Sequence, residues 1–384
     1  MTMQIALHGG FGEKGRTCIG VAHGGFRVLL DAGVKTSDRG ARDYYPAIDP
    51  ASLASLDALV FTHAHEDHLA ALGWCLVNGF AGRVLMTAET RREMSAVLDG
   101  YAEPGERAAA ARLAIEPLAA GTTTSLGPLR ITTGRSGHVA GGVWLALDDG
   151  RVRFDYCGDV VPASPVFAMD ALPPCDAIAL DASYGDDDVP LRERAAEIAA
   201  WIAGHARGVV LPTPLHGRSA ELLCVVPGPL ALAPGMRDAL RAQLDQRDWL
   251  HPATLPQLEQ RLAAAEDWHP GDPLPSAALL CHDGMGMAGP SREILALARA
   301  TGHPTLFTGH VPAGTLGATM IAEALAHWIR LPTHPTCGEN VALAARSGAR
   351  VVLGHSCGRD ALVRLARHVP GLRVDATTGD TFEL

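Results

Sequence analysis

The sequence predicts an α/β fold, because short apolar runs of strand length alternate with amphipathic helical stretches along its 384 residues. The runs FRVLLDAG (26–33) and LDALVFT (56–62) are typical of buried strands, and each ends in a polar residue. Later apolar runs also end in Asp or His. Open α/β sheets carry their functional sites at the carboxyl ends of strands, so these ends are where we expect the chemistry.

More strands and one hairpin are predicted before residue 186. The apolar pattern predicts strands in RVLMTAE (83–89), LRITTG (129–134) and CDAIALDASYG (175–185). The stretch 143–157 is predicted to form a hairpin that turns at Asp148–Asp149–Gly150, because Asp-Gly favours tight turns.

The pattern changes at residue 187. A helix is predicted over 187–206, with Pro190 in its first turn and an apolar stripe at helical spacing. Residues 226–275 are rich in Ala, Leu, Arg and Pro and are predicted to be helices on the surface of a lobe. An order of strand, loop and helix is predicted three times, in 208–223, 278–298 and 349–368.

Composition narrows the class of protein. A hydrophobic content of 47% with 19% charged residues is typical of a globular chain. The net charge of −10 argues against indiscriminate wrapping of nucleic acid, although it leaves room for a local groove lined by Arg. The eight cysteines are scattered and form no C-x-x-C pair, which favours reduced thiols in the cytoplasm.

No targeting or membrane segment is expected. The N-terminus, MTMQIALHGGFGEKG, has neither a basic n-region nor a long apolar h-region. No apolar stretch approaches the roughly 20 residues that span a bilayer. We therefore expect a cytoplasmic protein without membrane partners.

The stretch FTHAHEDHLAAL (61–72) places His63, His65, Asp67 and His68 between a predicted strand and a helix. Imidazole and carboxylate together suit zinc or a similar ion. One ion cannot readily take four ligands from six consecutive residues, because successive side chains point in different directions. Two ions about 4 Å apart can share them. A polar loop with incidental histidines is the alternative, and the H-x-H-x-D-H spacing disfavours it.

Four other residues lie at suitable strand ends. His138 lies in a Gly-rich turn, and Asp159 follows a strand and could bridge two ions. His355 ends another apolar run, and Asp31 could orient a ligand histidine. Taken singly, His138 could equally be a surface histidine and Asp159 a turn or cap residue.

Together, H-x-H-x-D-H, a G-H before a Gly-rich turn, strand-G-D and a late strand-G-H resemble the metallo-β-lactamase superfamily. LDASYG (180–185) is similar to the acidic-S-T-Y-G motif that opens the insertion of the β-CASP nucleases. VVLPTPLHGRSAELL, ALLCHDGMGMAGPSREIL and TLFTGHVPAGTLG resemble further β-CASP elements. GGFGEKGRTC and DAGVK are closest to ribonuclease J, whose additional C-terminal domain has no counterpart in these residues.

The resemblance implies a metallo-β-lactamase αββα sandwich formed by residues 1–184 and 331–384. A β-CASP domain of α/β type would be inserted over 185–330. It also implies two zinc ions, with manganese as an alternative metal. The implied ligands are His63, His65 and His138 for the first ion, Asp67, His68 and His355 for the second, and Asp159 as the bridge.

The implied activity is that of a zinc-dependent nuclease that hydrolyses RNA, as an exonuclease, an endonuclease or both. Single-stranded DNA is a further candidate substrate, and a homodimer is left open. Asp67 is a catalytic candidate, His334 would be the general acid, and Asp181 would orient His334. Phosphate contacts are implied for Arg218, Gly284 and Gly286.

Two stretches depart from the family pattern. His334 lies in LPTHPTCGENVALA, where its neighbours are altered, and LGHS keeps His355 but replaces the family's following Gly-Glu. One alternative is a hydrolase of a small ester, thioester or lactam on the same fold, which the acidic net charge favours. A binding subunit that has lost catalysis is a second alternative, disfavoured because every expected ligand is present.

Overall fold

The computed structural model describes residues 2–36 and 40–384, and the chain divides into two compact units. Unit 1 comprises Met1–Pro162, Met169–Asp188 and His334–Leu384, and unit 2 comprises Ala163–Ala168 and Val189–Thr333. These divisions lie within four residues of the domain boundaries expected after residues 184 and 330. The sequence did not predict that the short segment 163–168 groups with unit 2.

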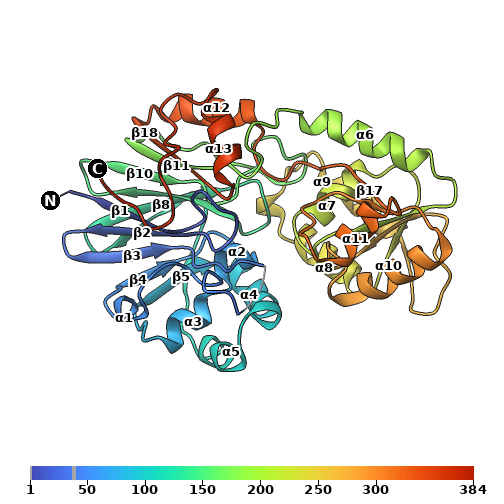
Figure 1. Ribbon diagram of the computed structural model, residues 1–384, viewed down its shortest axis with the longest axis horizontal. Coiled ribbons are helices and arrows are strands. Elements are labelled where there is room, and N and C mark those ends of the chain that lie inside the picture. The colour runs from blue at the N-terminus through green and yellow to red at the C-terminus, as the bar shows by residue number, and fades with distance from the viewer. Residues whose placement is uncertain (1, 37–39) are drawn as a thin grey trace. The chain divides into compact units, whose positions relative to one another are not determined.

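Unit 1 contains two β-sheets, which lie next to each other (Figure 1). The seven-stranded sheet has the order β19 (Thr381–Glu383), β1 (Gln4–Gly9), β2 (Cys18–His23), β3 (Phe26–Leu30), β4 (Ala58–Val60), β5 (Arg83–Thr87) and β6 (Glu116–Leu118). The six-stranded sheet has the order β18 (Val351–His355), β11 (Ala177–Asp181), β10 (Arg153–Tyr156), β9 (Val143–Asp148), β8 (Leu129–Arg135) and β7 (Thr123–Leu126).

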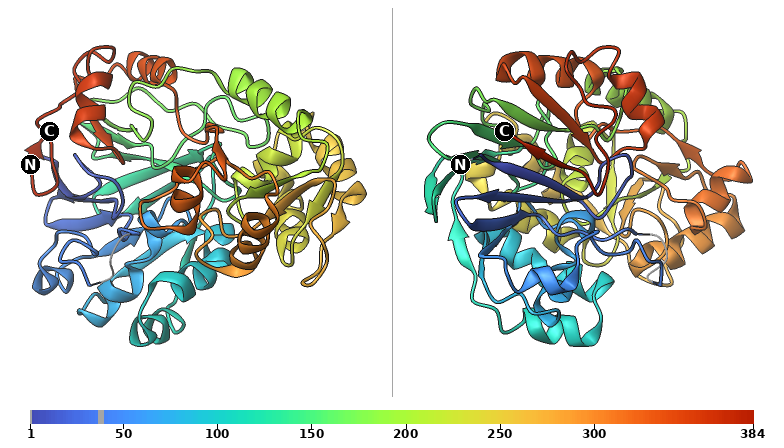
Figure 2. Two further views of the ribbon diagram at one scale, coloured as in Figure 1. Left: turned by 45° about the vertical axis from the view of Figure 1, so that its right-hand side comes forward. Right: turned by 60° about the vertical axis from the view of Figure 1, so that its left-hand side comes forward.

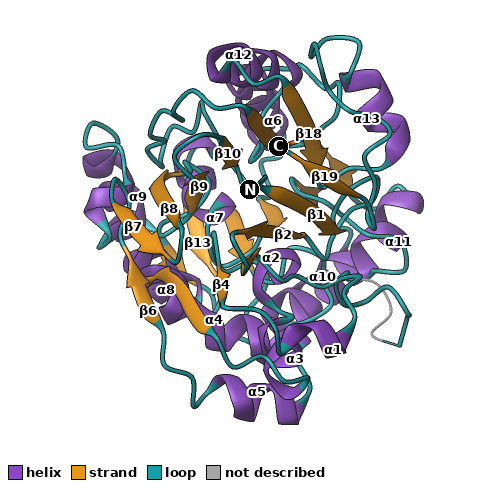
Figure 3. Cartoon of the chain, turned by 90° about the vertical axis from the view of Figure 1, so that its left-hand side faces the viewer, coloured by secondary structure: helices purple, strands orange, loops and turns teal. Residues whose placement is uncertain are grey.

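Helices cover the outer face of each sheet. In unit 1 they are α1 (Pro50–Leu53), α2 (Glu66–Leu69), α3 (Leu72–Val77), α4 (Ala88–Tyr101), α5 (Pro104–Ala110), α12 (Cys337–Ser347) and α13 (Arg359–Leu365). One buried cluster packs α2, α3 and α4 against β3 to β5, and another packs α12 and α13 against β11 and β18. Figure 3 shows the strands between α12 and α13 on one side and α1, α3 and α5 on the other. The predicted αββα sandwich is confirmed.

Strand pairing brings distant parts of the chain together in unit 1. β3, β4 and β5 pair in parallel and are largely buried, as expected of strands covered on both faces. β1 pairs with β19, so the two termini lie side by side (Figure 2). In the second sheet, β11 pairs in parallel with β18, and Asp181 lies opposite His355.

The predicted hairpin over 143–157 is confirmed as β9 and β10. Asp148 Oδ1 accepts a hydrogen bond from the N–H of Gly150, at 2.6 Å. Gly150 has a φ of +89°, a conformation that glycine adopts without steric cost. Asp149 Oδ1 accepts hydrogen bonds from the N–H groups of Arg151 and Val152, which closes the turn.

Unit 2 is built on a parallel sheet of order β12 (Val209–Pro212), β15 (Ala278–Cys281), β13 (Leu230–Leu232) and β14 (Glu266–Asp267). A bridge between Val210 and Thr305 continues it toward β16 (Leu306–Phe307), which pairs with β17 (His327–Trp328). The helices are α6 (Leu191–Ala203), α7 (Arg218–Val225), α8 (Met236–Leu244), η1 (Arg247–Trp249), α9 (Leu255–Ala264), α10 (Gly289–Thr301) and α11 (Leu316–Ala322).

Two expectations for unit 2 need correction. The stretch 226–275 is not purely helical, because β13 and β14 lie within it and β13 occupies an inner position of the sheet. The three-residue run Leu230–Leu232 has no β-branched residue, so only its burial between β15 and β14 makes it a strand. Pro190 is the N-cap residue of α6 and does not lie in its first turn.

Candidate metal centre

The segment from Phe61 to Leu69, which follows β4 and includes α2, is fixed at both ends and near its centre. Phe61 and Leu69 are fully buried at its two ends. The carbonyl of Asp67 accepts a hydrogen bond from the N–H of Thr17, at 2.8 Å. Gly33 passes so close that a Cβ atom there would lie 1.7 Å from the same carbonyl oxygen. Glycine at position 33 therefore allows the loop to approach the neighbouring strand end.

The three histidines and the aspartate predicted for the first ion converge in unit 1. One ligand atom from each of His63, His65, His138 and Asp159 lies within 4.8 Å of the other three. His65 Nδ1 is 3.1 Å from Nε2 of both His63 and His138. A tetrahedral zinc ion with Zn–N distances near 2.05 Å separates its ligand nitrogens by about 3.3 Å. The spacing of these atoms therefore fits a bound ion.

Burial sets the protonation of two of these rings. It lowers the pKa of His63 well below the usual value and that of His65 to about 3, and neighbouring histidines add to both shifts. Both rings are therefore neutral at neutral pH. A neutral imidazole offers a lone pair, which a metal ligand requires.

The residues predicted for the second ion leave a buried polar atom unsatisfied. Nε2 of His355 is buried and lacks a hydrogen-bond partner among the described residues, whereas the buried Nε2 of His68 and Oδ1 of Asp159 contact each other. His68 Nε2 lies 3.1 Å from Asp159 Oδ1 and 4.0 Å from Asp67 Oδ2. Unsatisfied buried polar atoms are rare in proteins, and a cation would satisfy Nε2 of His355.

Asp31, at the end of β3, fixes the orientation of His68. Its Oδ2 lies 2.8 Å from Nδ1 of His68 and accepts hydrogen bonds from Tyr156 Oη, at 2.7 Å, and Thr62 Oγ1, at 2.8 Å. The carboxylates of Asp159 and Asp67 outweigh burial and raise the pKa of His68, so the ring is protonated in the metal-free site. Loss of the Nε2 proton would leave Nε2 as the lone-pair nitrogen, because Nδ1–H is donated to Asp31. Asp31 thus makes the contact expected of a residue that orients a ligand histidine.

His355 is oriented by a different group. Its Nδ1 lies 2.9 Å from Oγ of Ser356, and that hydroxyl lies 3.4 Å from Thr17 Oγ1. Ser356 has a φ of +64°, an unusual left-handed conformation for a residue with a side chain. Thr17 also bonds the Asp67 carbonyl, so one buried threonine contacts both segments that carry candidate ligands.

His334 and Asp181 form a second cluster beside Asp159. Ligand atoms of these three residues lie within 4.8 Å of one another. His334 Nδ1 lies 2.8 Å from Asp181 Oδ2 and 3.7 Å from Asp159 Oδ2. Asp181 Oδ1 also accepts hydrogen bonds from Ser183, at 2.6 Å from the hydroxyl and 3.1 Å from the N–H.

Charges in this cluster stabilise one another. Burial opposes protonation of His334, but the carboxylates of Asp181 and Asp159 outweigh it and raise the pKa of the ring. Burial would raise the pKa of Asp159, yet His68 and His334 hold it well below the usual range. The arrangement therefore favours a protonated His334 between two ionised aspartates.

A family model described as a beta-lactamase superfamily domain matches residues 26–213, which include the loop after β4, His138, Asp159 and Asp181. The matched residues form a beta-lactamase superfamily domain, and they make up just under half of the chain. The match ends at residue 213, and the chain returns to the same fold with α12, β18 and α13.

Three relatives are similar to this chain in sequence over part of their length. The chain is 27% identical to the transcription termination factor FttA of Cenarchaeum symbiosum, over 69% of this chain and 46% of that protein. It is 27% identical to the endoribonuclease ysh-1 of Neurospora crassa, over 57% of this chain and 28% of the relative. It is 32% identical to the ribonuclease TTHA0252 of Thermus thermophilus, over 55% and 52% of the two chains.

The chain is thus similar in sequence to a transcription termination factor, an endoribonuclease and a ribonuclease. The matches span about half or less of the length of these relatives. A crystal structure of an Enterococcus faecalis V583 protein of unknown function covers the whole chain with a TM-score of 0.61 and 13% identity, a likeness of fold alone. In residues 2–36 and 40–384, every helix is too short or too polar to traverse a bilayer.

The residues predicted to contact phosphate lie in unit 2. Arg218 begins α7, donates to Thr333 Oγ1 at 2.9 Å, and packs so closely on Gly309 that a Cβ atom there would lie 2.2 Å from Nη1. The N–H of Gly286 donates to Asp283 Oδ1 at 2.6 Å. A phosphate would therefore have to compete with Asp283 for that N–H. Gly284 packs on the Thr213–Pro214 segment.

Sequence reasoning missed several residues that contact the candidate ligands of the superfamily site. Ser356 and Thr17 support His355, Tyr156 supports Asp31, and the buried Asn340 side chain donates to the Asp181 carbonyl at 2.9 Å. Their residue types are common in loops and helices. Apart from Ser356, which is next to His355 in the chain, they make contacts with residues far away in the sequence, so no spacing rule marks them.

Proposed function

We propose that the chain is a two-metal phosphodiesterase that hydrolyses RNA. The observation that carries the proposal is the meeting of two clusters at Asp159, one of four potential metal ligands and one containing the His334–Asp181 pair. Unsatisfied ligand atoms suit divalent ions, and a protonated histidine held by a carboxylate suits proton donation. The names of the ribonuclease and endoribonuclease relatives support RNA as the substrate.

The donor set fits two ions. We propose that zinc is the metal, with manganese as an alternative, because imidazole and carboxylate ligands suit both. Bound divalent ions lower the pKa of water and neutralise charge on phosphate oxygens. The proposed ligands are His63, His65 and His138 for one ion, Asp67, His68 and His355 for the other, and Asp159 for both.

His334 and Asp181 perform the acid step in this proposal. Asp181 Oδ2 accepts the Nδ1–H of His334, so the opposite nitrogen, Nε2, carries the transferable proton. A hydroxide, formed when water releases a proton to solvent, bonds to phosphorus as the bond to the leaving oxygen breaks. Nε2–H then protonates that oxygen, and Asp181 stabilises the ring orientation throughout.

Unit 2 would serve as the β-CASP insertion that holds the nucleic acid. Arg218 can contact a phosphate through its guanidinium, and its Nε is buried without a hydrogen-bond partner among the described residues. Thr213 and Thr308, which follow β12 and β16, likewise have buried hydroxyls with no partner in that part of the chain. Carboxyl ends of parallel strands are common ligand sites, which supports substrate contacts there.

A cytoplasmic location accords with the proposal. None of the eight cysteines is paired in a disulfide, as expected for a reducing compartment. Cellular RNA would be available as substrate in that compartment. Localisation of a tagged chain in its native cell would test this part of the proposal.

The deciding experiment uses end-labelled single-stranded RNA and DNA with purified protein loaded with zinc or manganese. A ladder from one end indicates an exonuclease, whereas discrete internal products indicate an endonuclease. His334→Ala protein serves as the matched negative control. If loaded protein cuts neither polymer but hydrolyses small esters, thioesters or lactams, the nuclease proposal is wrong.

A further inference from the structure

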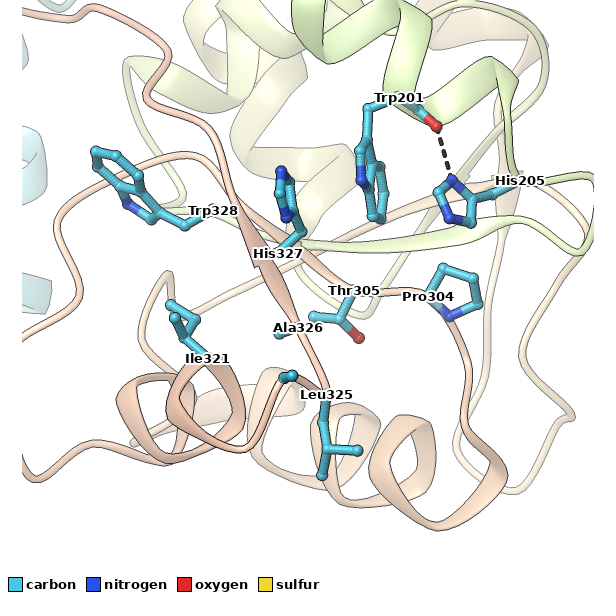
Figure 4. Close-up of a pocket in the computed structure, with 10 residues that line it drawn as sticks. Trp201, His205, Pro304, Thr305, Ile321, Leu325, Ala326, His327 and Trp328 are labelled. Carbon is cyan, nitrogen blue, oxygen red and sulfur yellow. Dashed lines mark hydrogen bonds between the residues drawn. The ribbon is translucent and has the colours of Figure 1, made fainter.

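A cavity in unit 2 is bordered by aromatic rings that the proposed catalytic steps do not use. Its volume is about 590 Å³, and it is lined by the end of α6, the turn before β16, the end of α11 and β17. Trp201 and His205 come from the α6 side, and His327 and Trp328 come from β17. Figure 4 shows these four rings in a row along one side of the cavity.

The rings are held in defined orientations. Trp201 and His327 are parallel within 6°, with centroids 5.7 Å apart, and His205 lies 4.1 Å from Trp201 on centroids. Nδ1–H of His205 donates to the carbonyl oxygen of Trp201 at 2.7 Å, which leaves Nε2 as an acceptor in the neutral ring (Figure 4). Trp328 is fixed by a hydrogen bond from Nε1 to the Gly309 carbonyl, at 2.8 Å.

Two large apolar side chains of this cavity are exposed. Trp328 is 38% exposed and Leu325 is 42% exposed, and they are two of the five large exposed hydrophobic residues in the described part of the chain. Their grouping beside a row of rings differs from singly scattered surface residues, which need no explanation. The exposed rings of His327 and Trp328 are therefore available to a flat partner, whereas Trp201 and His205 are partly buried.

The charge around the cavity suits an anionic ligand. Among the described residues that line it, none is Asp or Glu. Glu323, which is next to the lining segment, is paired with Arg299 at 2.7 Å. The guanidinium carbon of Arg330 lies 5.4 Å from the centroid of the Trp328 ring. On a chain of net charge −10, this histidine- and arginine-bordered surface is a local exception.

We propose that this cavity is a subsite for bases of single-stranded RNA, which stack on the exposed rings of His327 and Trp328. The inference rests on the proposed function and adds a contact remote from the phosphate chemistry. Every base has a π-face, so the subsite would tolerate any sequence, and stacking on an aromatic side chain is worth about 1–3 kcal/mol per base. Arg330 and the two histidines favour the phosphates that join such bases.

The test measures binding of a fluorescent single-stranded oligouridylate and oligoadenylate to His334→Ala protein, which should bind RNA and cut it only slowly. Adding Trp328→Ala should weaken binding of both oligomers by about 5- to 150-fold, whereas Trp328→Phe, which keeps a ring, should retain most of the affinity. Val77→Ala removes part of another exposed apolar side chain, in unit 1, and should leave binding unchanged.

The outcomes separate the subsite from the nuclease activity. With His334 intact, Trp328→Ala protein should hydrolyse bis(p-nitrophenyl) phosphate at the parental rate, because that substrate contains no nucleobase. If the parent cleaves RNA but Trp328→Ala leaves the affinity for both oligomers unchanged, the subsite proposal is wrong and the nuclease proposal stands. Binding that depends on Trp328 without any cleavage would support the subsite and remove the nuclease. Self-association that Trp328→Ala abolishes, with RNA binding unchanged, would identify a second copy as the occupant and also overturn the subsite.

Discussion

Nδ1 of His334 lies 2.8 Å from Oδ2 of Asp181, although 153 positions separate the two residues in the chain. Asp181 ends β11, and His334 is the first residue of unit 1 after the chain returns from unit 2. The carboxylate is fully buried and the imidazole is largely so, with 15% of its side chain exposed. This pair is the basis of the predictions about the acid step.

His334→Ala should lower turnover of RNA by roughly 10²- to 10⁴-fold, the usual contribution of general acid–base catalysis. Metal content and RNA affinity should stay close to those of the parent, because the imidazole is not among the proposed metal ligands. Steady-state kinetics, metal analysis and a binding assay check the three expectations separately.

A good leaving group distinguishes proton donation from other roles of His334. On bis(p-nitrophenyl) phosphate, His334→Ala should reduce turnover much less than on RNA, since the departing phenolate scarcely needs a proton. Equal losses on the two substrates would mean that the ring binds phosphate or maintains the local structure.

Asp181→Asn should reduce RNA turnover less than His334→Ala does. The amide keeps the size of the side chain but removes the negative charge that raises the pKa of His334. The acidic limb of the kcat profile should therefore be unchanged, while the basic limb moves to lower pH, because the ring loses its proton earlier. A basic limb that does not move would argue against the pairing.

Each chain should bind two divalent ions, and His355→Ala should reduce the number to one. The reason is that the cluster of His63, His65, His138 and Asp159 suffices for one ion, whereas Nε2 of His355 is an unsatisfied atom of the second set. Elemental analysis after reconstitution and removal of excess metal gives the stoichiometry. A parent that never exceeds one ion per chain contradicts the two-metal proposal.

Ser356 should support the second ion through its hydroxyl. Both Ser356→Gly and Ser356→Ala remove the contact with His355 Nδ1. Each should therefore lower the affinity for the second ion about 10- to 100-fold, as measured by competition with a chelator. Glycine also removes the left-handed strain at φ +64°, so the metal-free Gly variant should unfold at a higher temperature than the Ala variant. Unchanged metal affinity in both variants would leave Ser356 with a purely structural role.

Asp155→Asn should stabilise the protein above neutral pH. Burial raises the pKa of Asp155 from its ordinary value near 3.8 to about 7. The folded state therefore holds this proton when the unfolded chain has lost it, and stability falls as the pH rises from about 4 to about 7. Relative to the parent, the free energy of unfolding of the variant should be higher by up to about 4 kcal/mol at pH 8, and by progressively less toward pH 4.

Urea unfolding of parent and variant across that pH range checks the prediction. Asp155→Ala provides the control, because it also removes the charge but leaves a small cavity. The free energy of unfolding of Asp155→Ala, relative to the parent, should change with pH as it does for Asp155→Asn. Because of the cavity, it should be lower than that of Asp155→Asn at every pH. A difference that is flat with pH for both variants would mean that Asp155 is not protonated in the folded state.

The sequence alone was sufficient for the ligand candidates and for the superfamily. H-x-H-x-D-H after a buried strand is a local pattern, and its meaning depends on residues that are neighbours in the chain. The hairpin at Gly150 could be predicted for the same reason, because turn geometry depends on a few adjacent residues. β13 could not, since its three residues are a strand only through burial between two others.

Only the tertiary structure decided which atoms are left without partners and which residues support them. The contact of Ser356 with His355 is local, but its link through Thr17 to the loop of Asp67 requires segments from opposite ends of the chain to pack together. The row of rings in unit 2 likewise joins the end of α6 to β17. Hydrophobic periodicity determines which face of an element is buried, but the pairing of distant elements determines which polar atoms meet there.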